Sequence, residues 1–308
     1  MDWKVKALLL HVAATPIGYP AYQVLQKHFG KHRSPHWVFN KFRELAEMLT
    51  LIRSHGTVLE RAVVCEVGTG WIPLAPIGFF LCGAPCVHSF DLNSHLLESA
   101  LRRALHWIVA NQSRLNILLK EVVDPALLEE RFVILRKHVQ NPKKFFEVAN
   151  IHLHAPDDAA HTNLPAQSID IHYSTNVLEH IPESTLLAIL RETQRILKPN
   201  GVAVHFVDTS DHFSHSDPHI HSSHFLRFPP RVWNIVAGNR LAYHNRLRDK
   251  DYRTLFYEAG LNVIHNEFRS DKTALKALQS GFKIWNGYKE QNPEELTRVA
   301  LRYVSRLQ

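Results

Sequence analysis

Two acidic residues and two glycines stand where the chain could bind a ligand. The run Glu66-Val67-Gly68-Thr69-Gly70 ends a short apolar stretch, and Asp91 follows Gly70 by 21 residues. Glycines at a turn from strand to helix let the backbone approach a ligand closely. A carboxylate at the end of the next strand can accept hydrogen bonds from two ribose hydroxyls. This spacing predicts a binding site for a nucleoside.

The turn lacks the third glycine of the dinucleotide-binding pattern, because Ile72-Pro73 occupies its place. A pyrophosphate would need the N-terminus of the following helix to be open and close. A nucleoside without phosphates has no such need. The sequence therefore favours S-adenosylmethionine over a nicotinamide dinucleotide as the ligand.

Histidine is frequent, with 22 residues in 308, and it gathers with aspartate between positions 205 and 224. The ionisable members of this segment are His205, Asp208, Asp211, His212, His215, Asp217, His219, His221 and His224. Two functional interpretations stand beside that of a polar surface loop with incidental histidines. Asp208 or His212 could be a general base, or members of the group could bind a divalent metal that orients a hydroxyl. No standard zinc spacing occurs, so no residue is assigned as a metal ligand.

The elements that must position these residues alternate between strand and helix. Apolar, β-branched runs and turn residues predict strands at 61–66, 86–91, 146–154, 169–174, 202–207 and 261–268, with a seventh at 297–304 where helix competes. Helical spacing predicts helices at 73–81, 183–197 and 252–259, the second ended by a turn at 198–201. This order predicts an α/β fold with a Rossmann-like, mostly parallel seven-stranded sheet and helices on both faces.

Three further segments exceed what such a sheet needs. Residues 1–58 are predicted to be an N-terminal helical extension, and residues 59–308 the main domain. Within that domain, residues 94–148 are predicted to be a helical insertion and residues 209–250 an acceptor-side loop with some helix. Together they offer enough structure to cover a small ligand as a lid.

The motifs occur in the order found in a known family. Glu66–Gly70 resembles motif I of the class I S-adenosylmethionine-dependent methyltransferases, and Asp91 resembles their ribose-binding acid. Asp157-Asp158-Ala159 resembles the stretch before their fourth strand, and Asn176–Pro182 the motif after it. Leu197–Gly201 resembles the turn before their fifth strand. The resemblance covers about residues 60–270.

The resemblance implies a role for each matched residue. Glu66 would hold the methionine amino group of S-adenosylmethionine, and Asp158 with Ala159 would bind the adenine. The remaining cofactor-binding residues would be Gly68, Thr69, Gly70, Asp91 and Leu92 around the methionine and ribose, and Asn176 and Val177 at the methyl-donating end. His180 is the candidate catalytic base nearest the methyl group, with a purely structural role at a helix start as the alternative.

We therefore expect methyl transfer to a small-molecule acceptor, at a hydroxyl oxygen, by in-line displacement. The net charge of +7 comes from scattered basic residues, so nucleic acid is not favoured as a partner. An RNA or protein methyltransferase, or a non-catalytic metal- or cofactor-binding protein, is the alternative. The longest uncharged stretch, 67–90, contains three prolines and predicts no membrane span. Three cysteines indicate free thiols and a cytoplasmic location, and a homodimer is compatible with the sequence.

Overall fold

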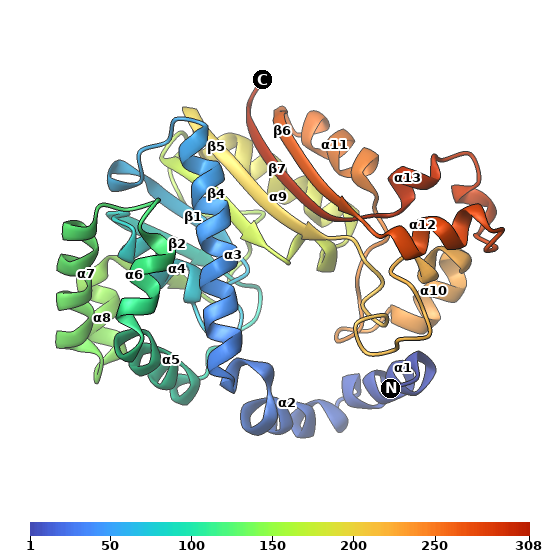
Figure 1. The fold of residues 1–308 in the computed structure, drawn as a ribbon, viewed down its shortest axis with the longest axis horizontal. Coiled ribbons are helices and arrows are strands. Elements are labelled where there is room, and N and C mark those ends of the chain that lie inside the picture. The colour runs from blue at the N-terminus through green and yellow to red at the C-terminus, as the bar shows by residue number, and fades with distance from the viewer.

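A single sheet of seven strands forms the centre of the computed structural model, which describes residues 1–308 apart from the side chain of His32 (Figure 1). The strands are β1 (Val63–Val67), β2 (Cys86–Phe90), β3 (Ile151–His154), β4 (Ile169–Thr175), β5 (Leu197–Asp208), β6 (Leu261–Ser270) and β7 (Arg298–Leu307). Their order is β3-β2-β1-β4-β5-β7-β6, and β7 runs antiparallel to both of its neighbours. The predicted Rossmann-like, mostly parallel sheet is confirmed.

Alternate residues of each strand pack on opposite faces of the sheet. Val64 of β1 belongs to a core formed with α3 (Pro35–Ser54), α4 (Leu74–Leu81) and the helices that follow β2. Its neighbour Cys65 belongs to a second core, formed with α9 (Glu183–Ile196) and α11 (Asp249–Glu258). Because both faces are covered, the inner strands can be apolar throughout, as their sequences are.

The direction of the chain reverses between β1 and β4. From β1 the chain runs outward through β2 to β3, and it then returns to β4 on the other side of β1. Loops that leave the carboxyl ends of these two neighbouring strands therefore turn away from each other. In open α/β sheets, this arrangement leaves a crevice in which ligands bind.

The predicted insertion is helical, but it extends further than expected. It comprises α5 (Glu98–Ala110), α6 (Gln112–Leu119), α7 (Pro125–His138) and α8 (Pro142–Ala149). The strand predicted at 146–154 is wrong over its first part, because α8 runs to Ala149 and β3 begins only at Ile151. The Asn141 side chain caps the start of α8, and Asn150 ends it in the left-handed conformation, with φ 52°.

Of two further predictions, the turn at 198–201 differs from the structure and the seventh strand is confirmed. The turn predicted at 198–201 lies within β5, where the pairing with β4 shifts between Ile169–Leu197 and Ile171–Val202. Lys198 holds this irregular part in place by an ion pair with Asp170, 2.7 Å away. The segment at 297–304, for which helix competed, is strand β7, because it pairs along its length with both β5 and β6.

The ends of the chain build a third apolar cluster beside the sheet. It joins α1 (Trp3–Ala14) to the segment 213–242, which includes α10 (Pro230–Ala237). Figure 1 shows α1 and α2 (Gly18–Phe29) as a band between α5 and α10, with α12 (Lys272–Gln279) and α13 (Pro293–Leu296) beyond. The short 3-10 helices are η1 (Lys31–Arg33), η2 (Leu59–Arg61), η3 (Leu178–His180), η4 (His224–Arg227) and η5 (Asn286–Tyr288). Within residues 1–308, no helix combines the length and apolar character needed to cross a membrane.

Replacing Phe42 with alanine tests whether α3 is an integral part of the main core. Phe42 is 1% exposed and lies in the core that α3 shares with α4 and the sheet. Its truncation should lower the free energy of unfolding by about 3–5 kcal/mol, since a buried phenyl ring is lost and a cavity left. Urea denaturation measures this change. Arg43→Ala, on the exposed face of the same helix, should change it by less than about 0.5 kcal/mol; equal effects would contradict the packing.

Candidate functional site

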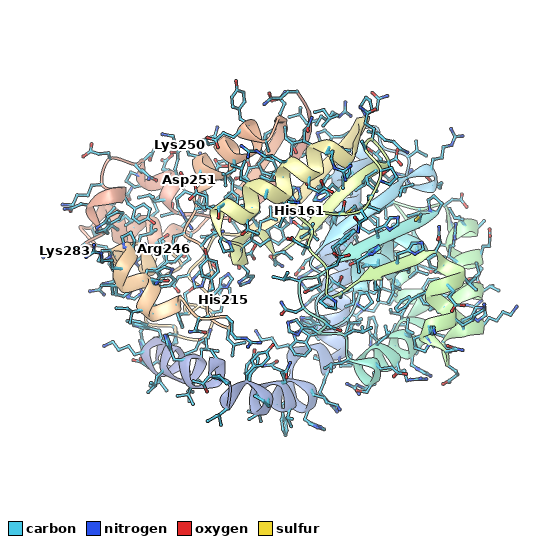
Figure 2. The ribbon with its side chains drawn as sticks, turned by 180° about the vertical axis from the view of Figure 1, so that it is seen from behind. His161, His215, Arg246, Lys250, Asp251 and Lys283 are labelled. Carbon is cyan, nitrogen blue, oxygen red and sulfur yellow. The ribbon has the colours of Figure 1, made fainter. Side chains whose placement is uncertain are left out.

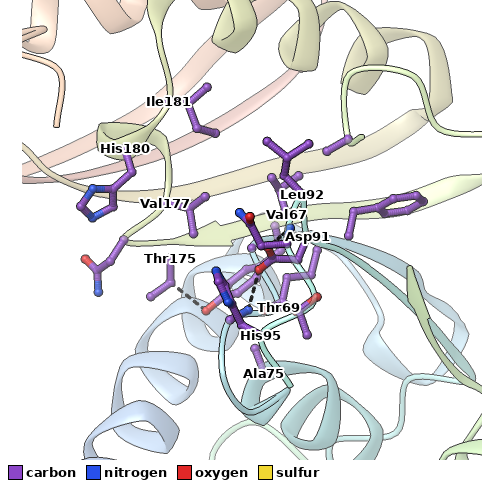
Figure 3. A pocket seen from close by; sticks show the side chains of 18 of the residues that line it. Val67, Thr69, Ala75, Asp91, Leu92, His95, Thr175, Val177, His180 and Ile181 are labelled. Carbon is purple, nitrogen blue, oxygen red and sulfur yellow. Dashed lines mark hydrogen bonds between the residues drawn. The ribbon is translucent and has the colours of Figure 1, made fainter. Parts of the chain in front are cut away.

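A cavity of ≈ 690 Å³ lies at the carboxyl ends of β1, β2 and β4, where the chain direction reverses (Figure 3). Its volume is in the range of small-molecule sites. Every cofactor-binding residue expected from the sequence lines it: Glu66, Gly68, Thr69, Gly70, Asp91, Leu92, Asp158, Ala159, Asn176 and Val177. Residues that are up to 111 positions apart in the sequence thus line the same cavity.

The turn after β1 favours glycine at two positions. Gly68 and Gly70 have φ angles of +93° and +66°, in the left-handed region that favours glycine. A Cβ atom on Gly68 would lie 2.4 Å from Cγ2 of Val177, in the turn after β4. The turn is held to the neighbouring strand by a hydrogen bond from the Gly68 N–H to the Phe90 carbonyl, 2.8 Å long. A ligand in the cavity therefore meets bare backbone here.

The Asp91 carboxylate ties two loops together. Its Oδ2 accepts a hydrogen bond of 2.8 Å from the Gly70 N–H, and its Oδ1 accepts one of 2.9 Å from the Asn93 N–H. Each oxygen keeps a second lone pair toward the cavity, which suits a pair of ribose hydroxyls. Leu92 follows with its side chain 71% exposed at the edge of the cavity, where it can cover an apolar face of a ligand.

Glu66 is a buried acid on the cavity wall, 6% exposed. Burial raises its pKa to about 8, although a hydrogen bond donated by the Ser89 hydroxyl works against this shift. Ser89 in turn lies 2.6 Å from the Thr69 hydroxyl. A cationic group in the cavity would stabilise the ionised carboxylate, so this end of the site suits an ammonium ion.

The adjacent acids Asp157 and Asp158 form another part of the cavity wall. The Asp158 carboxylate accepts a hydrogen bond of 2.9 Å from the Ala160 N–H, and the Asp157 carboxylate accepts one of 2.8 Å from the Asp158 N–H. Both residues line the cavity, and Asp158 is the more exposed of the two. Ala159, which follows this pair, also lines the cavity.

The turn after β4 carries the residues expected near the methyl-donating end. Asn176 adopts a positive φ of 55°, and its N–H donates a 3.0 Å hydrogen bond to the Phe206 carbonyl of β5. This geometry turns the chain sharply from β4 into η3, and it places Val177 and His180 on the cavity wall. Figure 3 shows His180 on the far side of Val177 from Asp91.

The three candidate catalytic residues come together, but only one of them lines the cofactor cavity. His180 lines this cavity, whereas Asp208 and His212 are not among its lining residues. The rings of His180 and His212 have centroids 5.0 Å apart, and Nε2 of His212 lies 3.9 Å from Oδ2 of Asp208. Nδ1 of His180 is 2.9 Å from the Tyr243 carbonyl, so it carries the proton and Nε2 has the free lone pair.

The remaining members of the 205–224 group have other surroundings. His205 is fully buried in β5 with Nδ1 2.8 Å from the Ser174 hydroxyl, and burial holds its pKa well below the ordinary value. Asp211 and His224 are buried together 3.5 Å apart, and Asp217 accepts a 2.8 Å hydrogen bond from the Trp3 N–H. These contacts are structural. Only His215, 3.5 Å from Asp208, joins the candidate catalytic residues, and Figure 2 shows it beside the central opening of the ribbon.

Sequence reasoning missed several residues of the site. Ser89 pairs directly with Glu66 in the parallel register of β1 and β2, so aligning the two strand ends could have found it. His95 stacks on Trp71 at the cavity, with centroids 4.9 Å apart. His244 stacks on His212 at 4.5 Å, and the buried Glu179 approaches both His180 and His212. Nothing in the sequence indicates the last two contacts, because they join distant segments.

These residues fit S-adenosylmethionine. The buried acid Glu66 could hold an ammonium group, the turn at Gly68–Gly70 offers bare backbone, and the Asp91 carboxylate could accept hydrogen bonds from ribose hydroxyls. The N-terminus of α4 begins with Pro73 as its N-cap and offers no open phosphate site. This agrees with a ligand that has no pyrophosphate.

Comparisons with known proteins give a family match and distant structural similarities. Residues 135–205 match the family model of a methyltransferase domain. A chain of the Haloferax volcanii complex between a methyltransferase activator and a methyltransferase is 15% identical over 94% of this chain and 95% of that chain, with a TM-score of 0.49. The geranyl diphosphate C-methyltransferase of Streptomyces coelicolor is 10% identical over 85% and 79%, with a TM-score of 0.46. Identities this low indicate nothing about a substrate, and no curated protein matches the chain.

The matched segment contains β3, β4 and the motif from Asn176 to Pro182. The glycine turn and Asp91 lie before it and complete the same cavity. The match to a methyltransferase domain over residues 135–205 and the seven-stranded sheet agree with the fold expected of a class I S-adenosylmethionine-dependent methyltransferase.

Proposed function

We propose that this methyltransferase acts on a hydroxyl oxygen of a small-molecule acceptor. The observation that supports this most directly is the group formed by His180, His212 and Asp208 at the edge of the cofactor cavity. A hydroxyl acceptor gains from a nearby group that takes its proton, whereas an amine needs this less. The group lies on the side of Val177 where an acceptor would approach.

S-adenosylmethionine, when bound, supplies a methyl group already activated on a sulfonium. The chain therefore has to position the two reactants and to accept one proton. In this proposal Glu66 holds the amino group of the cofactor, Asp91 holds its ribose, and Asp158 with Ala159 holds its adenine. His180, Asp208 and His212 face the acceptor and supply the proton acceptor.

A small acceptor is supported by the cover that α1 forms over the acceptor-side loop. The Trp3 N–H donates to Asp217, and the Lys6 ammonium donates a 2.8 Å hydrogen bond to the carbonyl of His212. The ring of Trp3 packs 6.2 Å from that of Phe213. In this proposal residues 1–58 are an extension that covers the main domain, residues 59–308. Within that domain, residues 209–250 form the other side of the acceptor site.

Transfer of a labelled methyl group to fractionated cell extract tests the acceptor class. The purified protein is incubated with labelled S-adenosylmethionine and with separate small-molecule, RNA and protein fractions. Label should enter the small-molecule fraction, and mass spectrometry should locate it on an oxygen. Label that enters the RNA or protein fraction instead would replace the proposal with the alternative that the basic charge suggests.

The proposal includes a cytoplasmic location. The three cysteines are free thiols, with Cys65 and Cys82 buried and Cys86 half-buried. Free thiols of this kind are stable in a reducing compartment.

The proposal also includes a homodimer. Light scattering of the purified chain measures the molar mass and tests this.

Replacing Asp91 with alanine should weaken cofactor binding by about 10- to 150-fold. The change removes the charged acceptor of the ribose hydroxyls, and hydrogen bonds to a charged group contribute about 1.5–3 kcal/mol. Isothermal titration with S-adenosylmethionine measures the dissociation constant. Glu130→Ala, which removes an exposed acid of α7, should leave it unchanged. Equal affinity of the Asp91 variant and the native chain would refute the assigned cavity.

Cofactor affinity should rise as the pH increases from 6 to 8. The raised pKa of Glu66, about 8, means that its carboxyl is protonated in the free protein over most of this range. Binding a cationic amino group requires the ionised form, so affinity should rise by up to about tenfold per pH unit and then level off. Titration at pH 7 in buffers of different ionisation enthalpy should detect a released proton. In Glu66→Gln, both the pH dependence and the proton release should be lost, and a flat profile in the native chain would contradict this role.

Replacing Asp208 with asparagine should separate acceptor chemistry from cofactor binding. Asparagine keeps the oxygen that accepts the 3.0 Å hydrogen bond from the Ser210 N–H but removes the charge. With an acceptor found in the extract screen, kcat should fall by about 100- to 10,000-fold, the range for a lost proton acceptor. The dissociation constant for S-adenosylmethionine should stay within about twofold, because Asp208 does not line the cofactor cavity. Full activity of the variant would exclude Asp208 from the reaction.

A further inference from the structure

A buried carboxylate of η3 has no hydrogen-bond partner. Glu179 is 1% exposed, and neither of its carboxylate oxygens makes a hydrogen bond with any described residue. The positive charge of Lys41 attracts this carboxylate, but the Lys41 ammonium forms an ion pair with Glu44, 2.7 Å away. Burying an acid in this way is costly unless another group compensates its charge.

The neighbouring His180 presents one nitrogen with a free lone pair. Because its Nδ1–H donates to the Tyr243 carbonyl, the ring orientation and the tautomer are fixed, and Nε2 is left to bind a ligand. The segment that supplies this carbonyl also fixes η3 itself. The Asn245 side-chain amide donates hydrogen bonds of 2.9 and 3.0 Å to the carbonyls of Leu178 and Ile181. These hydrogen bonds fix the backbone that carries Glu179 and His180.

A second imidazole arrives from the loop after β5. Nε2 of His212 is buried and makes no hydrogen bond among the described residues, and Asp208 lies 3.9 Å from it. The ring is stacked on that of His244, and Nε2 of His244 accepts a hydrogen bond of 3.5 Å from the backbone N–H of His212. An imidazole nitrogen that no protein group occupies is a common ligand of transition-metal ions.

We propose that Glu179, His180 and His212 form a binding site for one divalent transition-metal ion. One ligand atom from each of the three residues lies within 4.8 Å of the other two. Around a tetrahedral ion with bonds of about 2.1 Å, ligand atoms lie about 3.4 Å apart, which small side-chain rotations can reach. Two imidazoles and one carboxylate suit zinc, cobalt or manganese, whereas magnesium and calcium prefer oxygen ligands alone.

The site would leave at least one coordination position open. Three protein ligands with an open position are typical of metal ions that act on a substrate, whereas structural zinc sites have four. His180 lines the cofactor cavity, so the open position lies at the side where we propose that the acceptor binds. A hydroxyl oxygen bound there would be placed for methyl transfer, and Asp208 would be left as the proton acceptor. This role at the acceptor rests on the proposed function, but the binding of the ion does not.

Metal titration of the intact chain tests the site directly. The purified protein is treated with chelator, dialysed and titrated with Co²⁺, Zn²⁺ and Mg²⁺ without cofactor or acceptor. One Co²⁺ or Zn²⁺ per chain should bind and raise Tm, and Mg²⁺ should bind at least about 100-fold more weakly. The absorption spectrum of bound Co²⁺ should indicate nitrogen and oxygen ligands and no thiolate. Absence of saturable Co²⁺ and Zn²⁺ binding would overturn the inference.

Three variants locate the ion. Glu179→Gln and His212→Ala should each weaken Co²⁺ binding by about 100-fold or more, while His219→Ala, an exposed histidine of the same loop, should not change it. Glu179→Gln also removes the unpaired charge, so the metal-free variant should unfold at a temperature no lower than that of the metal-free native chain. Undiminished binding in Glu179→Gln would place the ion elsewhere and refute the site. Should His212→Ala not fold, the Glu179→Gln result decides.

Separate titrations distinguish this inference from the proposed function. A native chain that binds S-adenosylmethionine and transfers its methyl group but binds neither Co²⁺ nor Zn²⁺ would refute the metal site alone. Metal binding in a chain that transfers no methyl group to any small molecule would refute the proposed acceptor class alone.

Discussion

The contact between the turns after β1 and β4 is the constraint on which the site depends. These two parallel strands are neighbours in the sheet, yet the chain leaves them in opposite directions. Gly68 and Val177 therefore meet at van der Waals distance with no space for a Cβ atom between them. On one side of this contact lie the groups suited to the cofactor, and on the other lie η3 and the histidines. A single sheet edge thus positions two chemically different half-sites.

Buried ionisable groups concentrate at this edge. Glu66 and Glu179 are both withdrawn from water, and burial raises the pKa of each. Such groups oppose folding, because a charged or unpaired acid gains less from the protein than it loses from water. The cores on the two faces of the sheet, which include α3, stabilise the fold against this cost. Destabilising groups that lie in a cavity are typical of binding and catalytic sites.

Much of the fold and of the cofactor half-site could be predicted, because both depend on local order in the sequence. Glu66, Gly68 and Asp91 are separated from their strands by no more than a turn, so their positions follow once the strands are recognised. The strand predicted from residue 146 failed where a local signal was overlooked: Asn141-Pro142 is a good helix start. Glu179 could not have been identified as buried, since its cover comes from the segment 243–245, some sixty residues away. Likewise, the sequence gives no indication that His205 points into the core while His212 meets His180, because this depends on where β5 ends.

The close contact of Gly68 with Val177 also couples the two half-sites mechanically. A movement of the glycine turn would alter its contact with Val177, and Val177 directly precedes η3. A ligand that fixes the first turn therefore also restricts the orientation of Glu179 and His180. Such coupling is reciprocal, because the factor by which one ligand changes the affinity of the other applies in both directions. Donor and acceptor would then bind cooperatively, so that neither is held at full affinity until its reaction partner is present.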